Sequence, residues 1–187
     1  MSATAPSCTA LVVIDCQVDF GSPDGEMARR GMDMTAPQAA VAKCEQLVAA
    51  ARTAKVKVVF VGLTARPGEG DLCVEGTPGA AFIGPQPQAG DIIVTKTRYS
   101  AFARTGLADK LREHNTGSLV LAGLTTECCV AASAWAAFES GFQVTIASDG
   151  CAAYEPELHR QTLRALELSG AALIPAGQLV AAWEKSL

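Results

Sequence analysis

The 187-residue sequence has only two histidines, and this scarcity limits the chemistry available to it. His114 lies near the end of a predicted helix over residues 104–114, and His159 lies inside a second helical stretch. We interpret both as surface or helix-end residues rather than metal ligands. No grouping of cysteine, histidine and aspartate has the spacing of a zinc site. The sequence therefore predicts no metal ion and no other cofactor.

Long apolar runs, basic clusters and paired cysteines are also missing. Hydrophobic residues make up 49% of the chain, yet no run approaches the roughly 18 apolar residues of a membrane span. The first nine residues lack the basic and apolar regions of a signal peptide. A net charge of −4 without a basic cluster argues against a nucleic-acid partner. Seven scattered cysteines without a C-x-x-C pair favour reduced thiols. We expect a soluble, cytoplasmic protein with no membrane partner.

The glycine motifs of nucleotide-binding proteins are absent as well. The first apolar run continues into residues 15–20 without a G-x-G-x-x-G turn, and the pair Gly68 and Gly70 is too short a match. The chain also has no G-x-x-x-x-G-K-S/T segment. Both nucleotide-binding interpretations are therefore rejected.

What the sequence does contain is an alternation of short apolar runs with helical stretches. The predicted strands are residues 10–14, 57–61, 91–95, 118–122, 143–147 and 171–174, and the predicted helices are residues 37–54, 104–114, 129–140, 156–169 and 177–185. Such alternation is typical of parallel strands joined by right-handed crossovers. We predict an α/β fold: a three-layer, doubly wound, Rossmann-like sheet of six parallel strands with helices on both faces. The length favours one domain over residues 1–187.

Residues 64–90 form the longest irregular stretch, with four prolines and six glycines. Connections of this length without secondary structure are usually functional lids or flexible insertions. We expect one of these two roles here.

The segment 123–130, GLTTECCV, joins the fourth predicted strand to the helix 129–140, which is expected to be buried with Trp135 and Phe138. The first turn of a helix has free backbone N–H groups, so a thiol there has its thiolate favoured. Cys128 and Cys129 could instead be small buried apolar residues. The pattern leaves both interpretations open.

Three reactive side chains follow strand ends and should meet at the carboxyl edge of the sheet: Asp15, Lys96 and Cys129. Taken singly, Asp15 could cap a turn, Lys96 could be a solvated strand end, and Cys129 could fill the core. Taken together, and with no histidine available as a base, they indicate a cysteine nucleophile that a carboxylate deprotonates beside an ammonium group.

These residues lie in three ordered motifs: residues 10–20 (ALVVIDCQVDF), 95–102 (TKTRYSAF) and 123–130. Together the motifs resemble those of the isochorismatase-like cysteine hydrolases. The resemblance implies that Asp15 is the catalytic base, Lys96 its electrostatic partner and Cys129 the nucleophile. It also implies a cis peptide bond between Leu124 and Thr125, with the N–H groups of Thr125 and Cys129 forming an oxyanion hole. The implied reaction has two steps, formation and hydrolysis of a thioester.

Departures from the family pattern narrow the expected function. The nicotinamidases of this family bind a metal through an aspartate and several histidines between the first two motifs, and this chain has no histidine before His114. The presence of all three catalytic residues favours hydrolysis of a C–N bond. The residues of the motifs resemble those of biuret hydrolases and N-carbamoylsarcosine amidohydrolase. We predict a small amide, carbamoyl or ureido substrate and, by resemblance, a homo-oligomer. The alternatives are a vinyl-ether hydrolase of isochorismatase type and a catalytically inert binding scaffold.

Five residues near the carboxyl ends of the predicted strands are candidates for contacting the substrate: Phe20, Arg66, Tyr99, Phe102 and Tyr154. Arg66 could hold a carboxylate of the substrate or could be a solvated loop residue.

Overall fold

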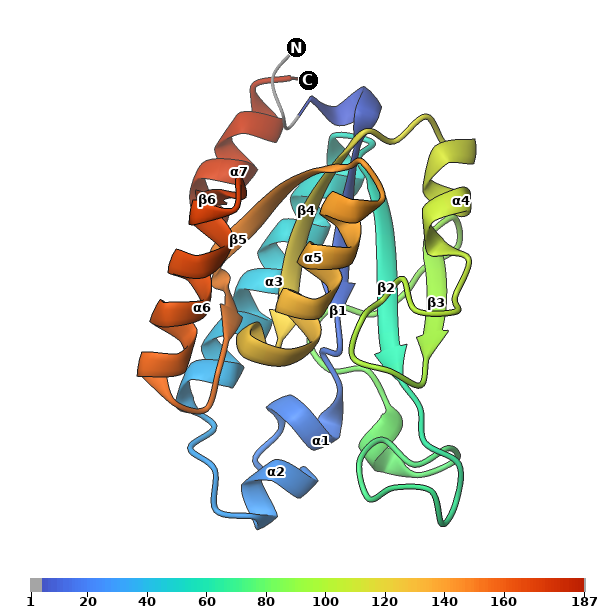
Figure 1. The fold of residues 1–187 in the computed structure, drawn as a ribbon, viewed down its shortest axis with the longest axis vertical. Coiled ribbons are helices and arrows are strands. Elements are labelled where there is room, and N and C mark those ends of the chain that lie inside the picture. The colour runs from blue at the N-terminus through green and yellow to red at the C-terminus, as the bar shows by residue number, and fades with distance from the viewer. Residues whose placement is uncertain (1–4, 187) are drawn as a thin grey trace.

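The apolar runs form a six-stranded sheet in the computed structural model, which describes residues 5–186. Every neighbouring pair of strands is parallel, and the strand order is β3-β2-β1-β4-β5-β6. The strands are β1 (Thr9–Ile14), β2 (Lys57–Leu63), β3 (Ile92–Lys96), β4 (Ser118–Leu124), β5 (Gln143–Ala152) and β6 (Ala172–Ile174). Figure 1 shows the strands side by side, with helices in front of the sheet and behind it. The predicted α/β fold with six parallel strands is confirmed.

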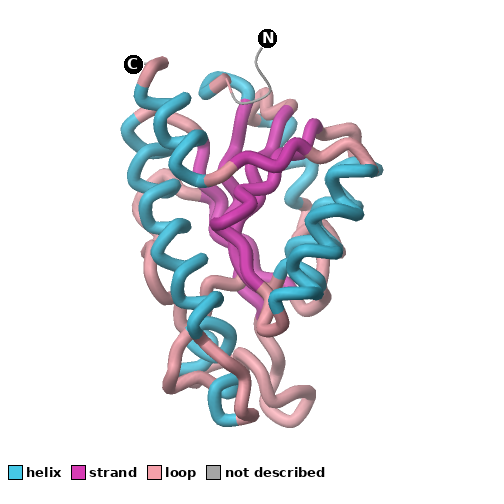
Figure 2. The backbone as a smooth tube through the Cα atoms, turned by 90° about the vertical axis from the view of Figure 1, so that its left-hand side faces the viewer, coloured by secondary structure: helices cyan, strands magenta, loops and turns pink. Residues whose placement is uncertain are grey.

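Helices cover both faces of this sheet, as Figure 2 shows. One face packs against α3 (Thr35–Thr53) and α7 (Ala176–Glu184), and the other against α4 (Leu107–Glu113), α5 (Ala131–Glu139) and α6 (Pro156–Leu168). The side chains of β1 point alternately to the two faces. Leu11 and Val13 pack in the core with α3 and α7, and Val12 and Ile14 pack in the core with α4, α5 and α6. A strand buried on both faces needs a continuous apolar sequence, which β1 has. The three predicted layers are therefore present.

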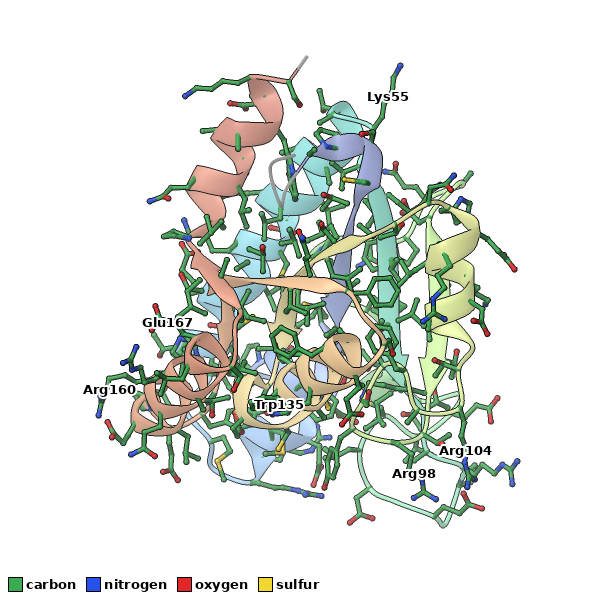
Figure 3. The ribbon with its side chains drawn as sticks, turned by 45° about the horizontal axis from the view of Figure 1, so that its top comes forward. Lys55, Arg98, Arg104, Trp135, Arg160 and Glu167 are labelled. Atoms are coloured by element: carbon green, nitrogen blue, oxygen red, sulfur yellow. The ribbon has the colours of Figure 1, made fainter. Side chains whose placement is uncertain are left out.

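Element boundaries differ from prediction where the backbone leaves the helical region. The helix expected from residue 104 begins at Leu107, because Arg104 and Gly106 adopt positive φ angles of 61° and 68°. The helix expected from residue 129 begins at Ala131, after one wide π-type turn over Thr126–Val130. Trp135, labelled on α5 in Figure 3, was expected to be buried but is 42% exposed, with its ring 6.1 Å from that of Phe138.

Two short helices that the sequence did not predict, α1 (Val18–Gly21) and α2 (Glu26–Arg29), follow β1. They lie beyond the carboxyl ends of the strands, beside the connection between β2 and β3 (Figure 1). That connection contains only a short 3₁₀ turn at Pro78–Ala80; another such turn, Pro6–Cys8, precedes β1. Among the described residues, no helix is both long enough and apolar enough to cross a membrane.

Candidate active site

The strand order reverses between β1 and β4, which is where parallel α/β sheets usually bind ligands. Asp15 follows β1 directly, with a positive φ of 51°, and its side chain is fully buried. Its backbone N–H donates to the Val61 carbonyl at 2.8 Å, so the turn that carries the carboxylate is held by the neighbouring strand β2.

Lys96, the last residue of β3, reaches this carboxylate from two strands away. Its Nζ lies 2.7 Å from Asp15 Oδ2, and both side chains are completely excluded from solvent. The same ammonium donates to the Cys129 sulfur at 3.3 Å and to the Arg98 carbonyl at 3.0 Å. The structure therefore brings together the three side chains that the sequence singled out, with the lysine nitrogen in contact with both of the others.

The third motif approaches β1 so closely that one position must be glycine. A Cβ atom on Gly123 would lie 2.0 Å from the Ile14 carbonyl oxygen, and its φ is 123°. The following peptide bond, between Leu124 and Thr125, is cis, at the position that the family resemblance implied. The chain then enters the turn Thr126–Val130, which places Cys129 beside Lys96.

Burial dominates the electrostatics of the three side chains. It raises the pKa of the Asp15 carboxyl above its ordinary value, although Lys96 acts in the opposite direction. It also raises the pKa of the Cys129 thiol; the Asp15 carboxylate raises this pKa further, and Lys96 lowers it. The expectation that a helix start would favour the thiolate was wrong for the resting site, because this thiol lies in a π-type turn and burial outweighs the cation.

Two polar side chains of the first motif, to which the sequence analysis gave no role, hold the long connection over the site. Gln17 donates from Nε2 to the carbonyls of Leu63 (2.9 Å) and Ala80 (2.8 Å), and its Oε1 accepts from the Leu63 N–H (2.8 Å). Asp19 accepts from the backbone N–H groups of Cys73 (2.7 Å) and Glu26 (3.1 Å). The connection is therefore tied to the residues that follow Asp15.

A cavity of about 830 Å³ opens in front of Cys129. Asp15 and Lys96 lie behind it, whereas Thr125 and Cys129 contribute to its wall. Four of the five predicted substrate contacts line it: Phe20, Arg66, Tyr99 and Tyr154. The remaining lining residues are Met27, Arg30, Leu63, Thr64, Ala65, Glu69, Gly70, Asp71, Leu72, Thr97, Arg98, Glu127 and Cys128.

The predicted contacts differ in how firmly they are held. The Tyr154 hydroxyl donates to the Phe20 carbonyl at 2.9 Å, which joins two of the cavity walls. Arg66 is 78% exposed and lies 3.8 Å from Glu69, so its guanidinium is at the mouth of the cavity. Phe102 lies outside the cavity, because its ring packs 6.0 Å from that of Phe142 in the core beneath α4 and α5.

Of the charged lining residues that sequence reasoning missed, two lie in the three motifs. Glu127 lies in the third motif, and Arg98 lies in the second, beside the connection between β2 and β3 (Figure 3). Within residues 5–186, the Arg98 side chain has neither an ion pair nor a hydrogen bond. Their position in the sequence could have identified them, because both are charged and stand within three residues of a strand's carboxyl end.

No metal site accompanies these groups in the described part of the chain. Residues 5–186 contain no set of three or more histidine, cysteine, aspartate or glutamate side chains placed to hold a metal ion. The donor set therefore does not fit the metal centre of the family's nicotinamidases.

The model of the isochorismatase domain matches residues 9–178, and so includes every element described above from β1 into α7. The chain belongs to the isochorismatase family. It is 31% identical over 161 residues to the ureidoacrylate amidohydrolase RutB of Agrobacterium fabrum, a match that covers 71% of each chain. Matches to further RutB proteins cover as little as 61% and as much as 75% of their length.

Two solved structures show the same architecture. An isochorismatase-like hydrolase from Alkaliphilus metalliredigens superposes with a TM-score of 0.83 at 27% identity, covering 94% of this chain and 98% of that one. The N-carbamoylsarcosine amidase of Thermoplasma acidophilum superposes with a TM-score of 0.75 at 25% identity, covering 90% and 96%. The isochorismatase-like protein described here lies in the amidohydrolase branch, among hydrolases of carbon–nitrogen bonds other than peptide bonds.

Proposed function

We propose that this protein is a cysteine-dependent hydrolase that cleaves the C–N bond of a small amide, carbamoyl or ureido compound through a thioester on Cys129. The observation that carries the proposal is the placement of Lys96 Nζ, 2.7 Å from the Asp15 carboxylate and 3.3 Å from the Cys129 sulfur, behind a cavity that the thiol faces. A nucleophile, a base and a cation are thus in contact at one end of the substrate space.

In the proposed first step, the Cys129 sulfur attacks the substrate carbonyl carbon while Asp15 takes the thiol proton. Because burial keeps the resting thiol neutral, this transfer accompanies the attack. The C–N bond then breaks and the proton leaves with the amine. In the second step, water attacks the thioester, with Asp15 again taking a proton, and the acid product and the free thiol are released.

The backbone N–H groups of Thr125 and Cys129 are the proposed donors to the oxyanion that develops in each step. Both residues line the cavity and are at most 7% exposed, so water competes little for a charge that forms there. Loss of a single donor of this kind typically lowers the rate by about 10²–10³.

The proposed substrate carries an acidic group in addition to the bond that is cleaved. The RutB relatives are named for ureidoacrylate, which combines a ureido group with a carboxylate. Arg66 was the candidate partner for such a carboxylate, and Arg98, which has no partner of its own, lines the same cavity. Phe20, Tyr99 and Tyr154 are the proposed apolar contacts. A homo-oligomer, a cytoplasmic location and a single domain stay predictions.

The contacts of Lys96 with Asp15 and Cys129 argue against both alternative functions. Opening a vinyl ether requires protonation of a carbon atom, for which a thiol in contact with a base and a cation has no role. An inert scaffold would have no need to keep a buried ion pair, since removing such charges from water is costly.

The experiment is to trap the thioester. The protein is exposed briefly to a panel of amides and ureides, including ureidoacrylate, and analysed by mass spectrometry, with ammonia release followed in parallel. We expect acylation of Cys129, no adduct and no turnover in Cys129→Ala, and retained turnover in Cys128→Ala, because Cys128 is exposed and the hydrogen bond from Lys96 goes to Cys129. An active Cys129→Ala, or an inactive Cys128→Ala that is folded, contradicts the assignment.

A further inference from the structure

Ser133, on α5, carries a fully buried hydroxyl that has no role in the proposed mechanism. Its Oγ donates to the carbonyl oxygen of Cys129, four residues earlier, at 2.6 Å. A serine in a helix often bonds back to the carbonyl four residues before it, so this bond alone is ordinary. The same Oγ also accepts a hydrogen bond of 2.9 Å from the backbone N–H of Ala101, 32 positions away. This second bond joins the helix that follows the nucleophile to the second motif.

Ala101 lies in the connection between β3 and α4, and both of its backbone groups are held by hydroxyls. Its N–H donates to Ser133, and its carbonyl accepts from the Thr105 hydroxyl at 2.5 Å. The residue is completely buried. Buried backbone groups are nearly always paired, and Ser133 is the acceptor that the fold supplies for this N–H. The connection is therefore anchored to α5 at Ala101.

These hydrogen bonds close a ring around the proposed reactive atoms. The Lys96 ammonium donates to the Cys129 sulfur at 3.3 Å and to the Arg98 carbonyl at 3.0 Å. From Arg98 the chain runs on to Ala101. The N–H of Ala101 then leads through the Ser133 hydroxyl to the Cys129 carbonyl. The cation and the nucleophile are thus joined twice, once directly and once through the backbone of the second motif.

The second link is important because the two reactive groups come from distant strands. Lys96 ends β3, whereas Cys129 follows β4, and β1 and β2 lie between these strands. The ammonium and the sulfur meet only because both connections bend over the same sheet edge. A displacement of about 1 Å in a catalytic group can lower a rate by about 10². A bond between the two connections therefore controls how well the sulfur is placed.

We propose that Ser133 is a positioning residue of this hydrolase, whose hydroxyl couples the Cys129 backbone to the second motif and so holds the nucleophile beside Lys96. This inference rests on the proposed function. Ser133 does not line the cavity and is inaccessible to solvent, so it does not contact the substrate. Loss of the hydroxyl should therefore slow formation of the thioester and leave substrate binding unchanged.

The test removes the hydroxyl in Ser133→Ala, which keeps a good helix former at this position. We expect kcat, and the rate at which the thioester forms on Cys129, to fall by about tenfold to a hundredfold, with KM changed by less than about twofold. Ser133→Thr keeps a hydroxyl that can bond back to the same carbonyl, so its kcat should stay close to that of the wild type. Ser118→Ala is the matched control, because it removes a buried hydroxyl, bonded to Gln143, at the start of β4 and away from the site.

Urea unfolding of each variant separates positioning from stability. Both serine-to-alanine variants should lose stability, but only Ser133→Ala should lose kcat per folded molecule. If Ser133→Ala does not fold, Ser133→Cys replaces it, since a thiol is only a weak donor and acceptor.

Two results would refute the inference while the proposed function stands: an unchanged kcat in folded Ser133→Ala, or an equal loss in folded Ser133→Thr, which would assign the effect to packing. If the wild type hydrolyses no member of the amide and ureide panel and Cys129 is not acylated, the proposed function fails and the inference fails with it.

Discussion

Replacement of Lys96 by methionine should destabilise the fold by an amount that depends on pH. Methionine keeps much of the apolar stem but removes the ammonium 2.7 Å from Asp15, in a place where neither side chain reaches solvent. Breaking a buried pair by removing one partner costs about 3–5 kcal/mol, because it leaves an unpaired buried charge. Typical domains have only about 5–15 kcal/mol of total stability, so the loss should be plainly measurable.

The pH dependence follows from the carboxylate that is left behind. Burial already raises the pKa of Asp15 with Lys96 present, and without Lys96 the main opposing influence is gone. A group whose pKa is higher in the folded state than in the unfolded state stabilises the fold below its unfolded pKa. That contribution is lost as the pH rises through the folded pKa. Relative to the wild type, Lys96→Met should therefore lose more stability at pH 8 than at pH 5.

Urea unfolding at fixed protein concentration measures this loss, with Lys110→Met, at an exposed position on α4, as the matched control. Asp15→Asn and the double variant complete a mutant cycle, in which the double variant should be more stable than the two single losses added together predict. The reasoning is refuted if the two losses add within about 0.5 kcal/mol. It is also refuted if Lys96→Met is equally destabilised at both pH values.

Two further predictions concern activity. Burial raises the pKa of Asp15 above its ordinary value of 3.8, and the proposed base must be ionised, so kcat/KM should fall on acidification with a midpoint above 3.8. Measuring the stability of the fold at each pH excludes unfolding as the cause. A midpoint at or below 3.8 would show that Asp15 is not the base. Because the described residues offer no metal-binding set, activity should survive prolonged dialysis against a chelator; loss of activity that added zinc, iron or manganese restores would contradict this.

The central features of the fold could be predicted because they depend on local patterns. A continuous apolar run such as β1 is typical of a strand buried on both faces, and the residue that ends it lies at the sheet edge. Asp15, Lys96 and Cys129 were found in this way, since each stands at or just beyond the carboxyl end of a strand. The cis peptide bond at Leu124–Thr125 was expected only from the family resemblance.

The remaining features depend on contacts between distant segments. Gln17 binds Ala80 across 63 positions, and Asp19 binds Cys73 across 54, so no local pattern marks either residue as an anchor. Phe102 stands six residues after β3, close enough to the sheet edge to suggest a substrate contact, but its ring turns into the core against Phe142. The raised pKa of the Cys129 thiol likewise depends on how deeply the turn is buried, which its sequence does not specify.

The raised pKa values of Asp15 and Cys129 are compatible with the proposed mechanism, in which the proton moves between the two. Before the transfer the site holds a carboxylate, an ammonium and a neutral thiol. During the transfer the negative charge passes from the carboxylate to the attacking sulfur, while the ammonium keeps its charge. The total charge is unchanged, so no net charge is created in a region that excludes water. Lys96 Nζ is 2.7 Å from one anion and 3.3 Å from the other, so the cation stays beside the negative charge throughout. Burial raises the pKa of both groups, so it disfavours the carboxylate and the thiolate in the same direction. In the proposed mechanism a carboxylate, with a buried lysine between it and the thiol, thus takes the place of the histidine base of Cys–His sites.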